Sequence, residues 1–336
     1  MATIGNSYAS LIDLYKNTQG GEVVGDIIEM LSQLNPVLQD MPAIECNQGT
    51  THMTTVRTGL PEPTWRALYQ AVQPTKGTVA QVKDATGNME AWAEIDAKLV
   101  ELAGEGASQF RLNEAQAYLQ GMANEWASTI FYGDGGSKFT GLAPRFNEYS
   151  TDKSDGAAYQ VIDAGGSGSD NTSIWMVVWS PNTAHGLYPK GTMAGITRED
   201  KGKQTKETDE GVYDVYREKF GLDTGISVRD YRYVVRIANI DVSELAAGNV
   251  DLYALMRKAY YRLYQRRVPN GTAAIYCNTD VMEALDAQAT NNGTTDNFVR
   301  LTPMEIQGET IMGYRGVPVR ETDALLSTEE AVPAKA

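Results

Sequence analysis

The pattern of apolar and polar residues predicts one long helix over residues 108–132. Its apolar residues recur three or four positions apart, which places them on one stripe of an α-helix. At a rise of about 1.5 Å per residue the helix is roughly 36 Å long, close to the diameter of a whole domain. We expect it to be the spine of its domain. The stripe consists of Leu112, Ala115, Leu119, Met122, Trp126 and Thr129.

Shorter patterns predict strands after this helix. Residues 173–179 form a nearly continuous apolar run, typical of a strand that is buried on both faces. Residues 212–220 also have strand character, and 231–240 alternate in a way that predicts a strand with one wetter face. Residues 197–211 are dense in Lys, Asp and Glu, which favours a solvated loop. The polar, glycine-rich residues 147–170 are expected to be mobile.

The last third of the chain alternates between helix and strand. A cap at Asn249 or Asp251 predicts a helix that ends at residue 267. A strand over 273–277 and a helix over 280–288 follow. Together these segments predict a compact α/β unit.

Two hairpins are expected. Residues 50–96 predict a long two-stranded excursion with polar, proline-containing turns. An isolated hairpin is marginally stable in water, so this one needs a neighbour to lie on. The second hairpin pairs 309–313 with 317–320, and the tail beyond Leu326 is expected to fray.

The first 49 residues read as an arm, in which Pro36 and Pro42 interrupt short helical pieces. A narrow apolar stripe in this arm is too small to be buried by the arm itself and needs something to cover it. The stripe consists of Ile27, Met30, Leu31 and Leu34.

Composition narrows the range of functions. The 336 residues are 42% hydrophobic and carry a formal net charge of -14, which argues against a surface that grips nucleic acid. Cys46 and Cys277 are too few for a disulfide framework, which favours a reducing cytoplasm. We find neither a secretory signal nor an apolar run long enough to span a membrane.

Little in the sequence predicts catalysis. His52 and His185, the two histidines, are more often solvated or structural than catalytic in such settings. The glycine-rich residues 133–136 follow a helix instead of opening one, so a helix end and turn is favoured over a phosphate loop. The sequence contains no P-loop lysine, zinc-protease or calcium-loop motif. We therefore expect a protein that is not an enzyme and has no cofactor or metal.

Some exposed positions are candidates for binding. Trp65 and Arg66 lie between proline turns, where they either anchor an interface or remain solvated. Residues 257–267 are rich in Arg and Lys. This composition is typical of a site that binds a phosphate or an acidic neighbouring subunit, and equally of a solvated helix face. The candidate subunit-interface residues are Trp65, Arg66, Arg57, Lys76, Ile27, Met30 and Leu31.

The order of these parts resembles the tailed-bacteriophage major capsid proteins of the Hong Kong 97 type. More closely, the chain resembles the gene-product-seven family of podovirus-type major capsid proteins, and the likeness spans essentially its whole length. The segments that carry it are Met-Ala-Thr-Ile-Gly-Asn at 1–6, Ile-Glu-Met-Leu-Ser-Gln at 28–33, Thr-Thr-Val-Arg-Thr-Gly-Leu-Pro at 54–61, Phe-Tyr-Gly at 131–133 and Phe-Thr-Gly-Leu at 139–142.

The resemblance implies an α+β fold of the Hong Kong 97 type with named parts. These are an N-terminal arm (1–49), an extended β-hairpin loop (50–96), a peripheral domain with the spine helix (97–146), an axial domain with a mixed sheet and returns to the peripheral domain (147–305), and a peripheral-domain hairpin with the C-terminal tail (306–336).

The resemblance also implies a function. The chain would self-assemble into hexamers and pentamers of an icosahedral phage head that encloses double-stranded DNA without sequence-specific binding. Its partners would be copies of itself and portal, scaffolding or decoration proteins, and it would assemble in the cytoplasm of a host bacterium. Two alternatives remain open at this point: an encapsulin-type cellular compartment, and a soluble acidic enzyme such as a hydrolase.

Overall fold

The computed structural model describes residues 18–19, 22–23, 35–208, 211–266, 268–291, 301–306 and 309–335. Its helices are α2 (Val37–Asp40), α3 (Ala97–Leu102), α4 (Ala107–Tyr132), α5 (Val242–Ala246), α6 (Leu252–Arg262) and α7 (Thr279–Asn291). Its strands are β1 (Thr18–Gln19), β2 (Glu22–Val23), β3 (Ala43–Glu45), β4 (Thr51–Gly59), β5 (Thr78–Ala85), β6 (Gly87–Asp96), β7 (Val161–Asp163), β8 (Asn171–Trp179), β9 (Ala184–Tyr188), β10 (Thr197–Thr208), β11 (Gly211–Val228), β12 (Val234–Asp241), β13 (Thr272–Cys277), β14 (Thr302–Ile306), β15 (Glu309–Tyr314) and β16 (Val317–Glu321).

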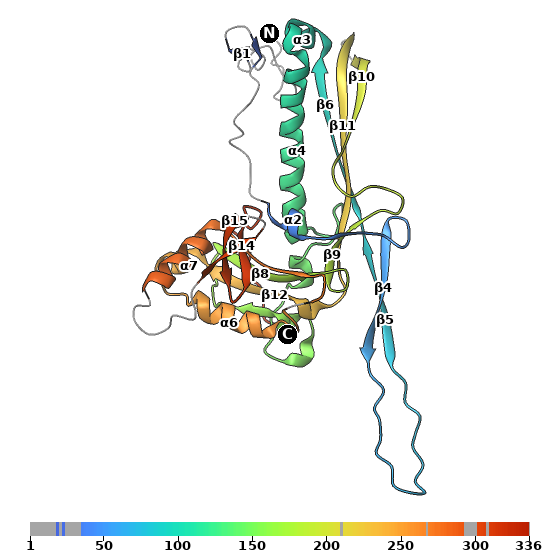
Figure 1. The fold of residues 1–336 in the computed structure, drawn as a ribbon, viewed down its shortest axis with the longest axis vertical. Helices are drawn as coiled ribbons and strands as arrows, with labels where there is room; N and C mark the ends of the chain where they lie inside the picture. The colour runs from blue at the N-terminus through green and yellow to red at the C-terminus, as the bar shows by residue number, and fades with distance from the viewer. Residues whose placement is uncertain are drawn as a thin grey trace.

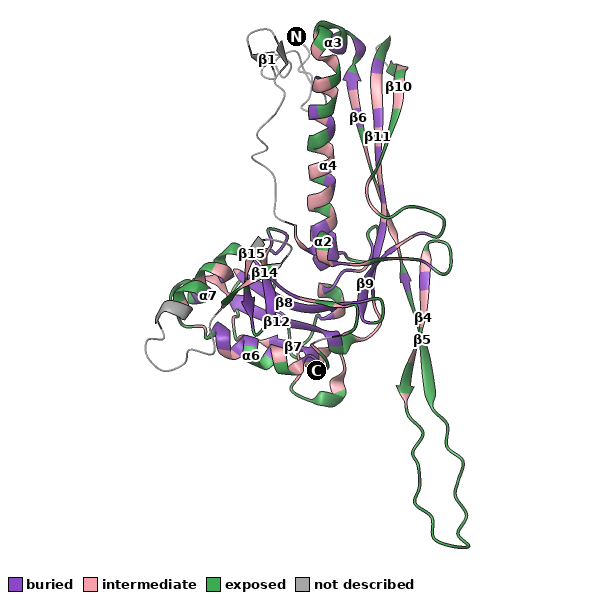
Figure 2. Cartoon of the chain, viewed as in Figure 1, coloured by how far each residue is buried: buried purple, intermediate pink, exposed green. Residues whose placement is uncertain are grey.

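The described residues form three parts (Figure 1). In the elongated part α4 lies beside β6, β10 and β11. The compact part is a mixed sheet around β8, together with α6 and α7. The third part is the antiparallel β4–β5 hairpin, which projects away from both. Figure 2 shows that the interior of the compact part is buried while the far end of the hairpin is exposed.

The predicted spine helix is confirmed as α4, which has 26 residues. Ala115 and Met122 pack against Phe220 and Leu222 of β11, so one stripe of the helix faces the long strands. Leu112, which we placed on this stripe, is instead 39% exposed. The buried stripe of α4 therefore consists of the residues that face the long strands.

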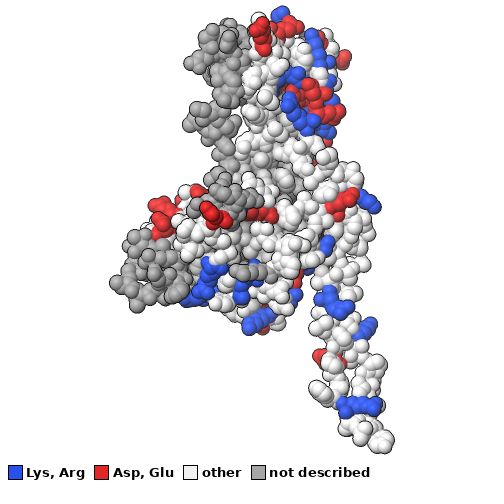
Figure 3. Space-filling model, viewed as in Figure 1, with Lys and Arg blue, Asp and Glu red and all other residues white. Residues whose placement is uncertain are grey.

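We expected residues 197–211 to form a solvated loop, and this prediction is wrong, because residues 197–208 form β10, which pairs with β11. Its charges are matched across the sheet. Glu218 of β11 lies 2.7 Å from Arg198 of β10 and 2.7 Å from Arg111 of α4, and Arg111 also lies 2.7 Å from Asp200. In Figure 3, Lys and Arg mix with Asp and Glu at this end of the elongated part. Cross-strand pairs of opposite charge stabilise a strand that looks like a loop in sequence.

The predicted buried strand is confirmed as β8, whose nine residues are all buried. Its side chains alternate between two cores, as the period of a strand requires. Ile174, Met176 and Val178 share a core with residues of α6 and α7, whereas Trp175 and Trp179 share the other with the end of α4. Both faces of β8 are covered, which explains its continuous apolar run.

The sheet of the compact part extends on both sides of β8. On one side β12 is antiparallel to β8, and β7 is parallel to β12. On the other side β13 is antiparallel to β8 and parallel to β16, and the order continues through β15 to β14. β11 extends from the elongated part to pair with β9 at its end. One long strand thus connects the two parts.

The predicted helix–strand–helix unit is confirmed. The Asp251 carboxylate accepts a hydrogen bond from the Ala254 amide at 2.9 Å and caps α6. The helix ends at Arg262, five residues before the predicted end. The Asn278 side chain accepts a hydrogen bond from the Val281 amide at 3.0 Å in the first turn of α7.

We expected residues 231–240 to form a strand with one wetter face, and this is wrong in two respects. The strand begins at Val234, after a 3₁₀ turn at Tyr231–Tyr233, and both of its faces are buried. Arg236 occupies the core because its guanidinium pairs with Glu329, with Nη2 and Oε2 2.8 Å apart. A charged residue within a strand pattern can therefore mark a buried ion pair.

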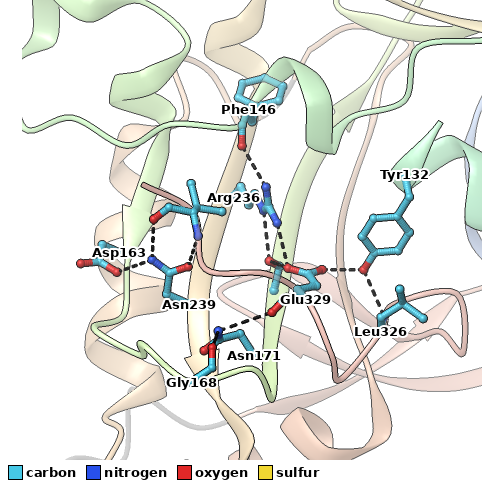
Figure 4. A network of polar contacts seen from close by, with 11 residues as sticks. Tyr132, Phe146, Asp163, Gly168, Asn171, Arg236, Asn239, Leu326 and Glu329 are labelled. Carbon is cyan, nitrogen blue, oxygen red and sulfur yellow. Dashed lines mark hydrogen bonds and ion pairs between the residues drawn. The ribbon is translucent and has the colours of Figure 1, made fainter. Parts of the chain in front are cut away.

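The C-terminal tail was expected to fray, but Glu329 and Val332 are both buried. Figure 4 shows how the tail is held. Glu329 accepts hydrogen bonds from the hydroxyls of Tyr132 and Ser173. Asn239 binds the Val332 backbone on both sides, through Oδ1 to the amide at 2.7 Å and through Nδ2 to the carbonyl at 3.0 Å. The tail is therefore part of the core.

The predicted terminal hairpin forms as β15 and β16. β16 pairs with β13, and Tyr314 and Val319 share a core with residues of α6 and α7, whereas Leu325 and Val332 share a core with the end of α4. Residues 147–170, expected to be mobile, contain 3₁₀ turns and β7, in which Ile162 is buried.

Candidate subunit interface

Strand pairing holds the projecting hairpin together near its base. β4 and β5 pair from Thr51 and Ala85 to Gly59 and Thr78, with a register shift between Arg57 and Gly59. Residues 60–77, the loop tip, form the far end (Figure 1). β6, which we expected to continue this excursion, pairs with β11 in the elongated part. Only β4, β5 and the loop tip therefore project.

The loop tip exposes large apolar side chains. Trp65 and Tyr69 are fully exposed, at 100% and 102% of their reference areas, and Leu60 and Leu68 are more than three-quarters exposed. Each residue from 60 to 83 is classed as exposed, as Figure 2 shows. Contiguous exposed apolar surface of this kind is typical of interaction sites. The loop tip has no core of its own.

The hairpin is basic although the chain is acidic. The hairpin, residues 51–85, contains four basic residues and two acidic residues, in a chain of formal charge -14. In Figure 3 blue side chains are spread along this part of the molecule. The predicted interface residues Arg57, Arg66 and Lys76 are all exposed here, along with Trp65. Ile27, Met30 and Leu31, the predicted candidates of the arm, lie outside the described residues.

The root of the hairpin is clamped by buried polar contacts. Asp84 of β5 is 4% exposed and lies 2.8 Å from the Arg145 guanidinium, which also donates to the Ile226 carbonyl at 3.2 Å. His52 of β4 lies 2.8 Å from the Arg229 guanidinium. These contacts orient the hairpin relative to the compact part. A short alternating strand pattern gives no signal for them.

Both histidines belong to this root. They are buried, with ring centroids 5.8 Å apart, so they are structural and the solvated alternative is wrong. Burial and the nearby Arg229 guanidinium lower the pKa of His52. Burial, together with Arg229 and His52, lowers the pKa of His185 to about 3. Both rings are therefore neutral at pH 7, and His185 stays neutral in mildly acidic solution.

The turn after α4 explains its glycines without a ligand. A Cβ on Gly133 would lie 2.1 Å from the Phe139 carbonyl oxygen, and a Cβ on Gly141 would lie 2.7 Å from the Gly133 amide nitrogen. The Leu142 amide then donates to the Ile130 carbonyl at 2.9 Å, which returns the chain to the helix end. The predicted helix end and turn is confirmed. Close backbone approach makes glycine necessary at both positions.

Other kinds of site find no support in the described residues. They contain no cluster of three or more His, Cys, Asp or Glu side chains placed to hold a metal ion. Among their helices, none combines the length and the apolar character that crossing a bilayer requires.

The chain is similar to known proteins over much of its length. The model of the family described as "Major capsid protein GP7" matches residues 18–333. The solved structure of bacteriophage Epsilon15 is 32% identical, with a TM-score of 0.78, and the match covers 100% of both chains. At 10% identity and a TM-score of 0.45, the capsid of the native GTA particle matches 66% of this chain and 94% of its own. The structure of Mycobacterium phage Adephagia is also 10% identical, with a TM-score of 0.45, and the match covers 68% of this chain and 97% of that chain.

None of the curated proteins gives a match. The family match and the full-length match to Epsilon15 set aside the encapsulin and hydrolase alternatives. The chain therefore belongs to the Major capsid protein GP7 family: it is a structural subunit of the icosahedral head of a tailed phage, with a Hong Kong 97-like α+β fold, it is located in the capsid of the virion, and it is not an enzyme.

Proposed function

We propose that the projecting hairpin makes the main contact between neighbouring subunits, with Trp65 and Arg66 as its anchors. The observation that carries this proposal is the full exposure of a Trp and a Tyr on a loop tip that has no core of its own. Burying one large apolar side chain contributes about 1.5–3 kcal/mol. The loop tip therefore gains most of its stability from a neighbour.

Charge supports the same contact. A basic hairpin on a chain of formal charge -14 is attracted to the remaining, acidic surface of another copy. Arg57 and Lys76, near the base of the loop tip, add to this attraction and help fix its register. Trp and Arg are also the residue types that most often dominate interface energetics.

The assembly we propose consists of hexamers and pentamers that close around double-stranded DNA. The acidic character of the chain disfavours tight, sequence-specific contact with packaged DNA. Portal, scaffolding or decoration proteins would be its further partners.

The division into parts is likewise a proposal. It comprises an arm (1–49) whose stripe of Ile27, Met30 and Leu31 is covered by a neighbour, a projecting loop, a peripheral domain on α4 and an axial domain around β8. Deleting residues 1–49 tests the arm. Closed shells of normal size from the shortened chain would show that the arm does not interlock subunits.

The hairpin is tested by the double variant Trp65→Ala/Arg66→Ala. Both side chains are exposed, so the isolated subunit should unfold at the same temperature as the unmodified protein while the yield of closed particles falls. The matched control is Lys190→Ala/Met193→Ala, which removes an exposed cation and an exposed apolar side chain from the turn between β9 and β10, outside the hairpin. An unchanged particle yield and particle stability for the Trp65 and Arg66 variant would refute the proposal.

A further inference from the structure

A hollow of about 370 Å³ at the C-terminal end of α6 is lined by cations and tyrosines. We call it the Arg/Tyr hollow. Its basic side chains are Lys153, Arg232, Arg262 and Arg266, and its lining contains no Asp or Glu. In Figure 3, Lys and Arg gather along the lower edge of the compact part, around α6. This concentration of positive charge stands out in an acidic chain.

Tyrosine rings order all three guanidiniums of the Arg/Tyr hollow, and Arg232 lies 4.2 Å from the centre of the Tyr264 ring. Arg262 lies 4.4 Å from the centre of the Tyr159 ring and donates to the Val161 carbonyl at 2.9 Å. Arg266 lies 4.9 Å from the centre of the Tyr261 ring. Stacking on an aromatic face fixes a planar guanidinium and reduces the entropy lost when it binds a carboxylate. These side chains are therefore arranged for a partner.

Most cations of the Arg/Tyr hollow have no carboxylate partner in the part of the chain that the structure describes. Arg232 pairs with Asp230, with Nη2 and Oδ2 2.6 Å apart. Within the described residues, Lys153, Arg262 and Arg266 form no ion pair. Arg262 and Arg266 donate to backbone carbonyls, which leaves their positive charge without a neutralising carboxylate among the described residues. Arginine and tyrosine in a concave surface are the composition of an interface anchor.

The N-terminal end of the same helix has the opposite character. A second hollow, of about 620 Å³, lies between α5, the loop before α6, and α7. Its charged lining consists of Asp251, Asp280 and Glu283, with no Lys or Arg. We call it the acidic hollow. Asp251 caps α6, so the two hollows lie at opposite ends of one rigid helix, roughly 16 Å apart along its axis at about 1.5 Å per residue.

Two different surfaces of one chain that complement each other suit a ring. In a ring of identical subunits, each copy uses one surface toward the preceding copy and another toward the following copy. The two hollows of one chain cannot meet, because α6 separates them. We infer that the Arg/Tyr hollow of one copy binds the acidic hollow of the next copy around the ring, through paired Arg and carboxylate side chains. This inference rests on the proposed assembly into hexamers and pentamers.

Packaged DNA is the competing occupant of the Arg/Tyr hollow. The concave shape favours the subunit, since duplex phosphates are bound along an extended surface, whereas a hollow accepts a single side chain such as the exposed Glu283 of the acidic hollow. The chain also carries a matching acidic hollow of its own.

Charge reversal tests the contact. Arg266→Glu and Glu283→Arg should each reduce assembled rings and particles by about tenfold or more, measured by sedimentation velocity of the full chain. The double variant carries both reversals and should recover to near the unmodified level. Lys258→Glu is the matched control, because Lys258 is exposed on α6 but does not line the Arg/Tyr hollow, so assembly should be unchanged. Lys153→Glu repeats the reversal at an exposed position in case Arg266→Glu unfolds, which thermal unfolding of the unassembled subunit shows.

If Arg266→Glu and Lys153→Glu both assemble normally, the inference is overturned. It is also overturned if the double variant Arg266→Glu/Glu283→Arg assembles no better than the two single variants. Normal particles from Arg266→Glu with reduced affinity for a short DNA duplex would assign the Arg/Tyr hollow to nucleic acid and also overturn it. In these cases the proposed assembly stands. Absence of particles from the unmodified chain would instead overturn the proposed assembly together with this inference.

Discussion

Replacing Glu329 by alanine should unfold the subunit far more easily than its place near the end of the chain suggests. The carboxylate accepts hydrogen bonds from Tyr132 and Ser173 and lies 2.8 Å from Nη2 of Arg236. The side chains of Arg236 and Glu329 are 5% and 4% exposed. The substitution therefore leaves a buried cation without its carboxylate and two hydroxyls without their acceptor.

The size of the effect follows from this burial. Removing one partner of a buried ion pair costs about 3–5 kcal/mol, because the remaining charge is desolvated and unpaired. Arg236 keeps two acceptors, the Phe146 carbonyl at 2.9 Å and the Ser173 hydroxyl at 3.0 Å, which favours the lower end of that range. A loss of about 3 kcal/mol shifts the folding equilibrium by more than roughly a hundredfold.

Urea unfolding of the unassembled subunit, followed by tryptophan fluorescence, measures this loss. Trp175 is a suitable probe because it is fully buried and the Arg236 guanidinium lies 5.1 Å from its ring centre. The double variant Arg236→Met/Glu329→Leu removes both charges and should lose less stability than Glu329→Ala. Lys335→Ala is the matched control, since it breaks an exposed ion pair with Asp155 in the same tail and should leave the midpoint unchanged. A loss below about 1 kcal/mol for Glu329→Ala, within the range of surface pairs, would refute the account of the tail as part of the core.

Three further predictions concern the turn, the root of the hairpin and pH. Gly133→Ala should lower the thermal unfolding temperature, because its Cβ would lie 2.1 Å from the Phe139 oxygen. The control Gly121→Ala, on the helix α4, meets nothing within 4 Å and should be neutral or stabilise by up to about 1 kcal/mol. Equal unfolding temperatures for the two variants would contradict the packing of this turn. Asp84→Asn should weaken the ion pair with Arg145 and speed hydrogen exchange in β4 and β5. The control Asp223→Asn, at an exposed contact with Asn88, should leave exchange in β4 and β5 unchanged. Unaltered protection in Asp84→Asn would show that this ion pair does not hold the hairpin. The pKa of His185 is lowered to about 3 in the folded state, so the unfolded state binds more protons below pH 6.5. The free energy of unfolding therefore falls as pH falls, by about 2 kcal/mol between pH 7 and 5. Urea unfolding at the two pH values should show a smaller loss in His185→Asn, and a loss equal to that of the unmodified protein would remove His185 as the cause.

The features that the sequence predicts correctly depend on local periodicity. The stripe of α4 repeats with the helical period, and the apolar run of β8 reflects a strand covered on both faces. The cap at Asp251 is also a local signal, since its carboxylate binds an amide three residues along the chain. Such patterns need no knowledge of the tertiary structure.

The features that were missed depend on partners distant in sequence. Glu329 is buried because Arg236, 93 residues away, neutralises it. β10 is a strand because Arg198 finds Glu218 across the sheet and Arg111 of α4 completes the network. A charged residue considered alone is expected to be exposed to solvent, so its burial can be predicted only when its partner is known.

Of the candidate interface, the sequence indicated Trp65 and Arg66 from their position between proline turns. It did not single out Leu68 and Tyr69, whose exposure adds to the apolar surface of the loop tip. Tyr69 also has a positive φ of 69°, unusual for a bulky residue, and no local pattern signals it.

Electron microscopy of particles from a loop-shortened variant tests the central claim most directly. Gly59 and Thr78 are the last pair of β4 and β5, so residues 60–77 can be replaced by Asn-Gly, which closes a two-residue hairpin. The account predicts closed shells from the unmodified chain, and from the variant a subunit with unchanged thermal unfolding that forms no closed shells. Closed shells of normal size and number from the shortened chain would contradict it.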